Sequence, residues 1–253
     1  MTEAEKARSQ MREGHWTGPT VYKVPGFVQC NLVILGKPNA YDFLLYCQRN
    51  PKACPLIEVT DPGDPVPHLS APGADLRTDL PRYRVFENGK AAGDMTDIRA
   101  LWNPDSVAFL FGSSLTFDHA LARLGIPPSE DVWVFDTSLE TVRAGRFHGP
   151  LVVTMRLMSR QQAITATQLT TRYIYTHGAP IHIGAPGEIG VDLGHPLVGR
   201  PLECIPESQI PLFWACGVTP QQAAVHSGID HMITHAPGHG FVTDLQADRT
   251  CLP

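Results

Sequence analysis

Proline and glycine interrupt this chain so often that its regular elements must be short. The 23 prolines and 22 glycines make 45 of 253 residues, a share above the usual one but below that of disordered chains. Proline ends helices and strands because it lacks a backbone N–H donor, and glycine permits the conformations of tight turns. The chain is therefore predicted to fold into short helices and strands joined by ordered turns.

The apolar residues are sufficient for a buried core but are not arranged to cross a bilayer. Hydrophobic residues make up 43% of the chain, enough for one large domain or two modest ones. The longest apolar runs, such as 32–35 and 107–111, have the length of strands. The formal charge is -5 and no basic block could hold a phosphate backbone. We expect neither a membrane nor a nucleic acid as partner.

The chain is expected to be cytoplasmic. Its first residues, 1–6, are acidic and polar, where a secretory signal would be basic and then apolar. The six cysteines form no Cys-x-x-Cys pair and are interpreted as reduced thiols. The composition leaves open whether the protein forms a homo-oligomer.

Apolar spacing and turn residues predict an alternation of strands and helices. The predicted helices cover 2–13, 39–50, 97–102, 116–125, 159–172 and 219–228, and the predicted strands cover 28–35, 107–111, 151–157, 181–184, 232–234 and 241–245. This order predicts an α/β fold with a mixed sheet and flanking helices. The helix between strands 151–157 and 181–184 predicts a parallel pair with a right-handed crossover.

Local signals predict where several segments begin and how the domains divide. Ser159 with Gln162, and Thr219 with Gln222, read as capping boxes, and Thr116 reads as the start of a helix. The proline-rich stretch 60–75 is predicted to be a surface loop. A smaller α+β subdomain is predicted at 116–189, inserted into a main α/β domain formed by 1–115 and 190–253.

Three histidines, His182, His235 and His239, lie in glycine- and proline-bounded segments that resemble strand ends, where α/β folds bind ligands. Pro237 and Gly238 exclude a helical His-x-x-x-His metal motif. A turn could instead bring His235 and His239 together as an acid and a base with separated pKa values. The alternatives are that both rings only bond turn carbonyls, or that all three histidines hold a metal ion.

Two further segments are candidates for binding an anion. The turn 112–116 contains Ser113 and Ser114 at the start of a predicted helix, where N–H groups and the helix dipole favour a carboxylate or phosphate. The alternative there is ordinary capping by Thr116. Arg77 and Arg82 could clamp a carboxylate, or belong to a solvated ion-pair face. No dinucleotide, nucleotide or nucleophile-elbow motif is present, so no cofactor is expected.

Seven segments together resemble the D-glutamate cyclase family, and the resemblance spans nearly the whole chain. They are 42–56, 75–83, 112–117, 149–156, 177–184, 213–220 and 233–244. The chain departs from the family pattern at three positions. It has Ser113 where the family usually has cysteine, Asp118 where it has glutamate, and Gly240 where it has methionine.

The resemblance implies a hydro-lyase that cyclises D-glutamate to 5-oxo-D-proline with loss of water. In that reaction the amine loses a proton, the departing oxygen gains one, and an oxyanion is stabilised. The implied acid–base pair is His235 and His239, oriented by Asp244, and their order in the chain leaves open which one is the base. The implied substrate-binding residues for a small carboxylate are Arg77, Arg82, Ser113, Ser114, His182 and Thr234.

A second hypothesis is a carboxylate-binding sensor or carrier without catalysis, motivated by the departures at Ser113 and Gly240. Both hypotheses need the same geometry. We expect His235, Ser113 and Arg77 to face one cavity.

Overall fold

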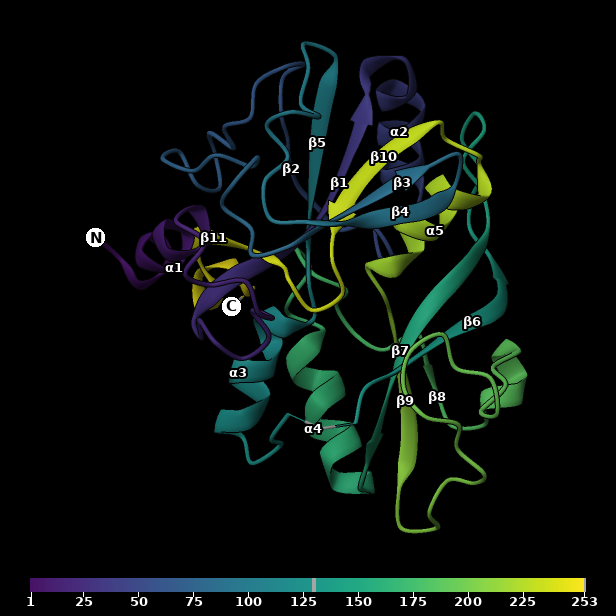
Figure 1. Ribbon diagram of the computed structural model, residues 1–253. Helices are drawn as coiled ribbons and strands as arrows, with labels where there is room; N and C mark the ends of the chain where they lie inside the picture. The colour runs from purple at the N-terminus through teal and green to yellow at the C-terminus, as the bar shows by residue number, and fades with distance from the viewer. Residues whose placement is uncertain (129–130, 253) are drawn as a thin grey trace.

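The structure of the protein, a computed structural model, describes residues 1–128 and 131–252. Within these ranges, two open antiparallel sheets and five α-helices confirm the α/β class with flanking helices (Figure 1). The helices are α1 (Glu3–Arg12), α2 (Lys37–Arg49), α3 (Leu115–Arg123), α4 (Arg160–Thr170) and α5 (Val218–His226). None of the helices in these ranges has the length and apolar character needed to cross a membrane.

The first sheet is built around β1 (Phe27–Gly36) and has the order β2-β5-β1-β10-β3-β4, with β11 also paired to β1. Its other strands are β2 (Leu56–Val59), β3 (Tyr83–Glu87), β4 (Lys90–Met95), β5 (Ser106–Gly112), β10 (His231–His235) and β11 (Phe241–Gln246). Strand β1 is central because its side chains are apolar on both faces, so it packs into two separate cores. One edge of β1 pairs with β10 and then with β11, so the β10–β11 connection projects from the middle of that edge.

The second sheet has the order β6-β7-β9-β8. Its strands are β6 (Trp133–Glu140), β7 (Pro150–Met158), β8 (His182–Ile183) and β9 (Ile210–Ala215). β7 and β8 run parallel to each other across α4, as predicted, but they do not pair directly, because each pairs antiparallel with β9, which lies between them. Strand β9, which comes later in the chain than β7 and β8, occupies the position between them.

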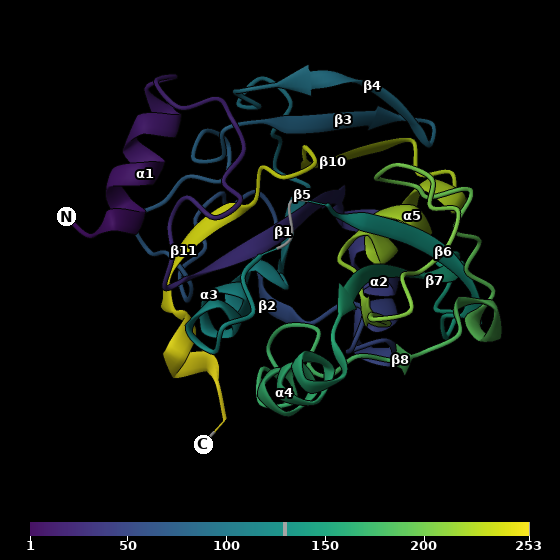
Figure 2. The same cartoon turned by 90° about the horizontal axis from the view of Figure 1, so that it is seen from below.

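Helices and loops cover the sheet faces that would otherwise expose apolar side chains. Helices α2 and α5 pack on one face of the first sheet, and the proline-rich segment packs on the other through Ala71, Ala74, Leu76 and Leu80. Helices α3 and α4 pack together against β9 of the second sheet, and α3 also contacts β1. Figure 2 shows α3 and α4 side by side, with α2 and α5 near each other and away from them.

The helix starts follow the predicted chemistry at one position and depart from it at two. Ser159 and Gln162 form the capping box of α4, as predicted. Helix α5 begins at Val218, and Thr219 bonds the backbone of Val152 instead of capping. Helix α3 begins at Leu115 without a side-chain cap. Thr219 therefore forms a tertiary hydrogen bond with Val152 in place of the local helix cap.

The predicted short helix at 97–102 is wrong, because these residues form a turn. Backbone N–H groups of Leu101 and Trp102 both reach the carbonyl of Ile98, which closes one turn without continuing it. The domain boundaries at 115/116 and 189/190 stay a prediction. The second sheet runs from Trp133 to Ala215 along the chain.

Gly112, at the end of β5, allows the backbone after α4 to approach this strand closely. A Cβ atom there would lie 2.0 Å from the carbonyl oxygen of Tyr175. Gly112→Ala is therefore expected to lower the free energy of unfolding by about 1–3 kcal/mol or more, because backbone must move. Urea unfolding measures the loss, with Gly73→Ala, whose Cβ meets nothing within 4 Å, as control. Equal stability of the two variants would contradict this packing.

Candidate active site

His235 is fixed in one tautomer by the backbone of the neighbouring strand. It ends β10, and its Nδ1 lies 3.1 Å from the backbone nitrogen of Leu32 in β1. A backbone N–H can only donate, so Nδ1 must be the unprotonated acceptor. The side-chain amide of Gln221, from α5, also approaches Nδ1 at 3.2 Å. The neutral ring therefore carries its proton on Nε2, for which the described residues provide no hydrogen-bond partner.

The surroundings of His235 keep it uncharged at neutral pH. Burial is the main cause that lowers its pKa to about 4; the backbone hydrogen bond with Leu32 opposes this shift, and His239 and Arg84 add to it. A second contact, of Nδ1 with the Leu32 carbonyl oxygen, is 3.5 Å long and too long to stabilise a protonated Nδ1 against the N–H donor. His235 can thus offer an N–H hydrogen bond but not an imidazolium proton near pH 7.

His239 is held in the opposite tautomer by its own turn. Its Nδ1 lies 2.7 Å from the carbonyl oxygen of Pro237. A carbonyl oxygen can only accept, so Nδ1 carries the proton and Nε2 keeps the lone pair. The ring is half-buried. The alternative that this histidine bonds a turn carbonyl is correct for Nδ1, and it prepares Nε2 to act as a base.

Arg82 lies at the same turn. The backbone N–H of Ala236, the residue after His235, donates to the carbonyl oxygen of Arg82. The guanidinium of Arg82 forms no hydrogen bond or ion pair within residues 1–128 and 131–252, whereas neighbouring Arg84 is paired with Asp94 at 2.8 Å. Arg82 is half-buried and therefore suited to bind a carboxylate beside the two imidazoles.

Asp244 does not orient the histidines, which corrects the role predicted for it. Its carboxylate accepts two hydrogen bonds from Arg8 of α1, at 2.8 and 3.0 Å. The backbone groups of Leu32 and Pro237 instead fix the rings of His235 and His239. Asp244 thus attaches α1 to β11.

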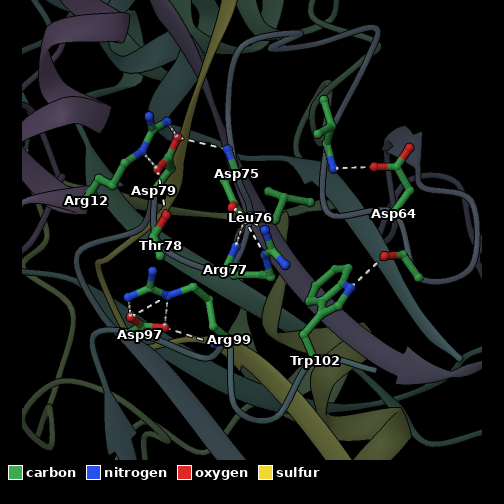
Figure 3. A network of polar contacts seen from close by, with 12 residues as sticks. Arg12, Asp64, Asp75, Leu76, Arg77, Thr78, Asp79, Asp97, Arg99 and Trp102 are labelled. Atoms are coloured by element: carbon green, nitrogen blue, oxygen red, sulfur yellow. Dashed lines mark hydrogen bonds and ion pairs between the residues drawn. The ribbon is translucent and has the colours of Figure 1, made fainter. Parts of the chain in front are cut away.

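Arg77 is also engaged elsewhere. Figure 3 shows its guanidinium bonded to Asp75, with Nε and Nη2 at 2.8 and 2.7 Å from the two carboxylate oxygens. In the same network Arg12 of α1 binds Asp79, which is fully buried. For Arg77 the ion-pair alternative is correct, because its nearest carboxylate is only two residues away.

The remaining predicted residues lie apart from the turn or are internally bonded. Ser113 is buried and its hydroxyl accepts from the Leu115 N–H, and Ser114 is the residue before α3. His182 belongs to the second sheet and its Nε2 contacts the carbonyl oxygen of Ala185 at 2.9 Å. Thr234 is buried, and its hydroxyl donates to the carbonyl of His235. Thr234 therefore supports the turn.

A cavity of about 130 Å³ beside α3 is lined by residues of α3, residues of the segment 22–29 and Pro128. His235, Ser113 and Arg77 are not among these lining residues, and their meeting at one cavity stays a prediction. The hypothesis that His182, His235 and His239 hold a metal ion requires that their side chains lie close together. No three His, Cys, Asp or Glu side chains of the described ranges gather as metal ligands would.

Sequence reasoning missed two site residues. Gln221 reaches His235 from α5, and its only sequence signal was its position in a predicted helix. Leu32 contributes a backbone N–H, which has no sequence signal. Their contribution depends on how β1, β10 and α5 pack together.

A second buried histidine makes stability depend on pH. Burial lowers the pKa of His177 to about 4, whereas in an unfolded chain it titrates near 6.5. The folded state therefore loses stability as pH falls from about 6.5 toward 4, by on the order of 3 kcal/mol. His177→Gln should reduce this dependence, measured by urea unfolding at about pH 7 and about pH 5. An unchanged dependence would contradict the burial of a neutral ring.

Comparison with known proteins identifies relatives of the whole chain. The family model for D-glutamate cyclase matches residues 107–244. Proteins named "Putative hydro-lyase" from Bacillus licheniformis and Geobacillus kaustophilus are each 48% identical to this chain, covering 97% of it and 95% of their own length. A Bacillus subtilis relative of that name is 46% identical over 94% of this chain and 95% of its own. The chain belongs to the D-glutamate cyclase family.

Proposed function

We propose that this protein is a hydro-lyase that removes water from a small amino or hydroxy carboxylic acid at the β10–β11 turn. The observation that carries the proposal is the pair of opposite tautomers at His235 and His239. One ring presents an N–H and the other a lone pair, both at Nε2. A dehydration needs both, because it takes a proton from one atom and stabilises or protonates a departing oxygen on another.

D-glutamate is the first substrate to test, because the description of the family names it. Its conversion to 5-oxo-D-proline forms a bond between the amino nitrogen and the γ-carboxyl carbon. Two protons move from the ammonium nitrogen to the departing carboxyl oxygen, which leaves as water. The α-carboxylate keeps its charge throughout and would be bound by Arg82.

The two histidines then have distinct roles. Nε2 of His239 accepts a proton from the amino nitrogen as general base and then delivers it to the departing oxygen as general acid, once for each of the two protons that move. The Nε2–H of His235 donates a hydrogen bond to the oxyanion that forms when nitrogen attacks carbon. Its lowered pKa of about 4 suits this role, because a neutral donor keeps its proton while it stabilises negative charge. Gln221 is a positioning residue through its contact with Nδ1.

Incubation of the purified protein with D-glutamate, monitored by proton NMR for lactam formation, tests the proposal. We expect turnover by the wild type and none by a His235→Ala, His239→Ala double variant. L-glutamate, 2-hydroxyglutarate and glutarate complete the panel. Full turnover by the double variant would disprove the mechanism. Stabilisation of the protein by an acid without conversion of any member of the panel would favour a sensor or carrier.

A further inference from the structure

Three buried polar atoms in residues 1–128 and 131–252 have no hydrogen-bond partner, and all three belong to residues that line the cavity beside α3. They are Oε1 of Gln29, Oγ1 of Thr116 and Oδ2 of Asp118. These residues are 4%, 2% and 2% exposed. Burying a polar group without a partner is unfavourable. Three such atoms around one cavity of about 130 Å³ therefore indicate a binding site.

The hydrogen bonds that Gln29 and Asp118 already make determine whether their remaining polar atoms can donate or accept. Nε2 of Gln29 donates to the carbonyl oxygen of Thr20 at 3.2 Å, so Oε1 is correctly assigned as a free acceptor. Oδ1 of Asp118 binds Arg156, which leaves Oδ2 as an acceptor. The hydroxyl of Thr116 can accept as well as donate. The cavity therefore offers three acceptors.

The charge of the residues that line the cavity also favours a hydrogen-bond donor that carries positive charge. Among its lining residues Asp118 carries negative charge, and neither lysine nor arginine is present. Arg156 binds Asp118 from outside this lining, and its guanidinium lies 5.4 and 5.5 Å from the ring centroids of Phe117 and Trp214. These aromatic faces stabilise the arginine charge on the side away from the cavity.

We propose that this cavity binds a primary ammonium group, whose three N–H bonds are donated to Gln29, Thr116 and Asp118. The number of donors on such a group equals the number of free acceptors. A hydroxyl, with one donor, would leave two of them without partners. The inference goes beyond the proposed function, because this site lies outside the histidine turn and the amino nitrogen that His239 would deprotonate is not the group bound here.

Gln29 connects this cavity to the histidine turn. Thr20, which binds the Gln29 amide, also lies within hydrogen-bond distance of the carbonyl oxygens of Gly238 and Gly240. A Cβ atom on Gly240 would lie 3.7 Å from Oε1 of Gln29. One cluster of side chains therefore supports both the cavity and the segment that carries His239.

Tyr22 is the side chain most suited to admit a ligand. The three free acceptors are closed off from solvent, so a neighbouring group must move. Tyr22 lines the cavity, is 44% exposed and has a φ of 59°, a strained conformation for a residue with a Cβ atom. Its burial, the charge of the Asp118 carboxylate and a hydrogen bond to that carboxylate raise the pKa of its phenol to about 12, so the phenol stays neutral and covers Asp118 until it moves.

Methylammonium and tetramethylammonium chloride test the site, because they have the same charge but only the first has N–H donors. Binding is measured by thermal shift and by titration followed with NMR. We expect methylammonium, but not tetramethylammonium, to stabilise the wild type. Thr116→Val should weaken that binding about tenfold, and Asp118→Asn should weaken it further. Asp105→Asn, at an exposed carboxylate, is the matched control and should bind as the wild type does.

Thr116→Val keeps the test decisive if Asp118→Asn fails to fold. It removes a hydroxyl that has no partner, so the variant should be at least as stable as the wild type while binding less well. Equal stabilisation by the two cations, or unchanged methylammonium binding by Thr116→Val, would overturn the inference. Since methylammonium is not a substrate of the dehydration, those outcomes do not depend on turnover. Absence of turnover with intact methylammonium binding would count against the proposed function alone.

Discussion

Replacing His239 with alanine is expected to lower turnover of D-glutamate by on the order of 10² to 10⁴-fold, the usual contribution of a general base. The reason is that Nε2 of His239 carries the lone pair of the turn while Pro237 holds the proton on Nδ1. The ring is half-buried, and its hydrogen bond to Pro237 is local. The variant should therefore keep nearly the stability of the wild type. Rates come from lactam formation by NMR, and stability from urea unfolding.

His195→Ala is the matched control, because that ring is 86% exposed and its Nδ1 contacts nearby Asp192. It should leave both rate and stability unchanged. A His239→Ala protein that retains the wild-type rate would show that another group is the base. A parallel loss of rate in His195→Ala would show that the assay reports on something other than the turn.

Replacing Arg156 with methionine is expected to lower the free energy of unfolding by about 3–5 kcal/mol. Arg156 neutralises Asp118, whose side chain is 2% exposed. Removal of the arginine leaves a carboxylate buried without its counterion. Methionine preserves much of the contact with Phe117 and Trp214, so the loss measures the charge and not a cavity. Urea unfolding measures it.

Arg123→Met is the comparison, because its ion pair with Asp248 is more than half exposed on both sides. Exposed pairs contribute about 0–1 kcal/mol, so this variant should differ little from the wild type. If Arg156→Met and Arg123→Met lose the same stability, Asp118 is not the buried anion that the structure describes. The same result would remove the negative charge on which the ammonium site depends.

Signals confined to a few residues were predicted well from the sequence. The capping box at Ser159 is complete within its own turn of helix. The turn at Pro237 and Gly238 joins two strands as expected and carries both histidines. In these cases the bonding partner lies within four residues, so the physical cause of the structure is present in the local sequence.

Features set by distant contacts could not be predicted. Strand β9 lies between β7 and β8, and no local pattern shows that a later segment fills that position. Thr219 bonds Val152 instead of capping its helix. Asp244 binds Arg8 from the opposite end of the chain. In each case a tertiary partner replaced the local one that the pattern indicated.

The candidate site was predicted in part for the same reason. His235, His239 and Arg82 lie at one turn because β10 and β3 are neighbours in the sheet. Arg77 had a carboxylate two residues away in Asp75, and the local ion pair formed. The cavity beside α3 combines Gln29 from β1 with Asp118 from α3, a combination that depends entirely on the packing of that helix.

The opposite tautomers of His235 and His239 are the central claim, and nitrogen-15 NMR of the histidine-labelled protein near neutral pH measures them directly. Long-range proton–nitrogen correlations distinguish a protonated from an unprotonated ring nitrogen, and His235→Gln and His239→Gln variants assign the signals. We predict that the neutral ring of His235 is protonated at Nε2 and that of His239 at Nδ1. Two rings in the same tautomer would contradict the account.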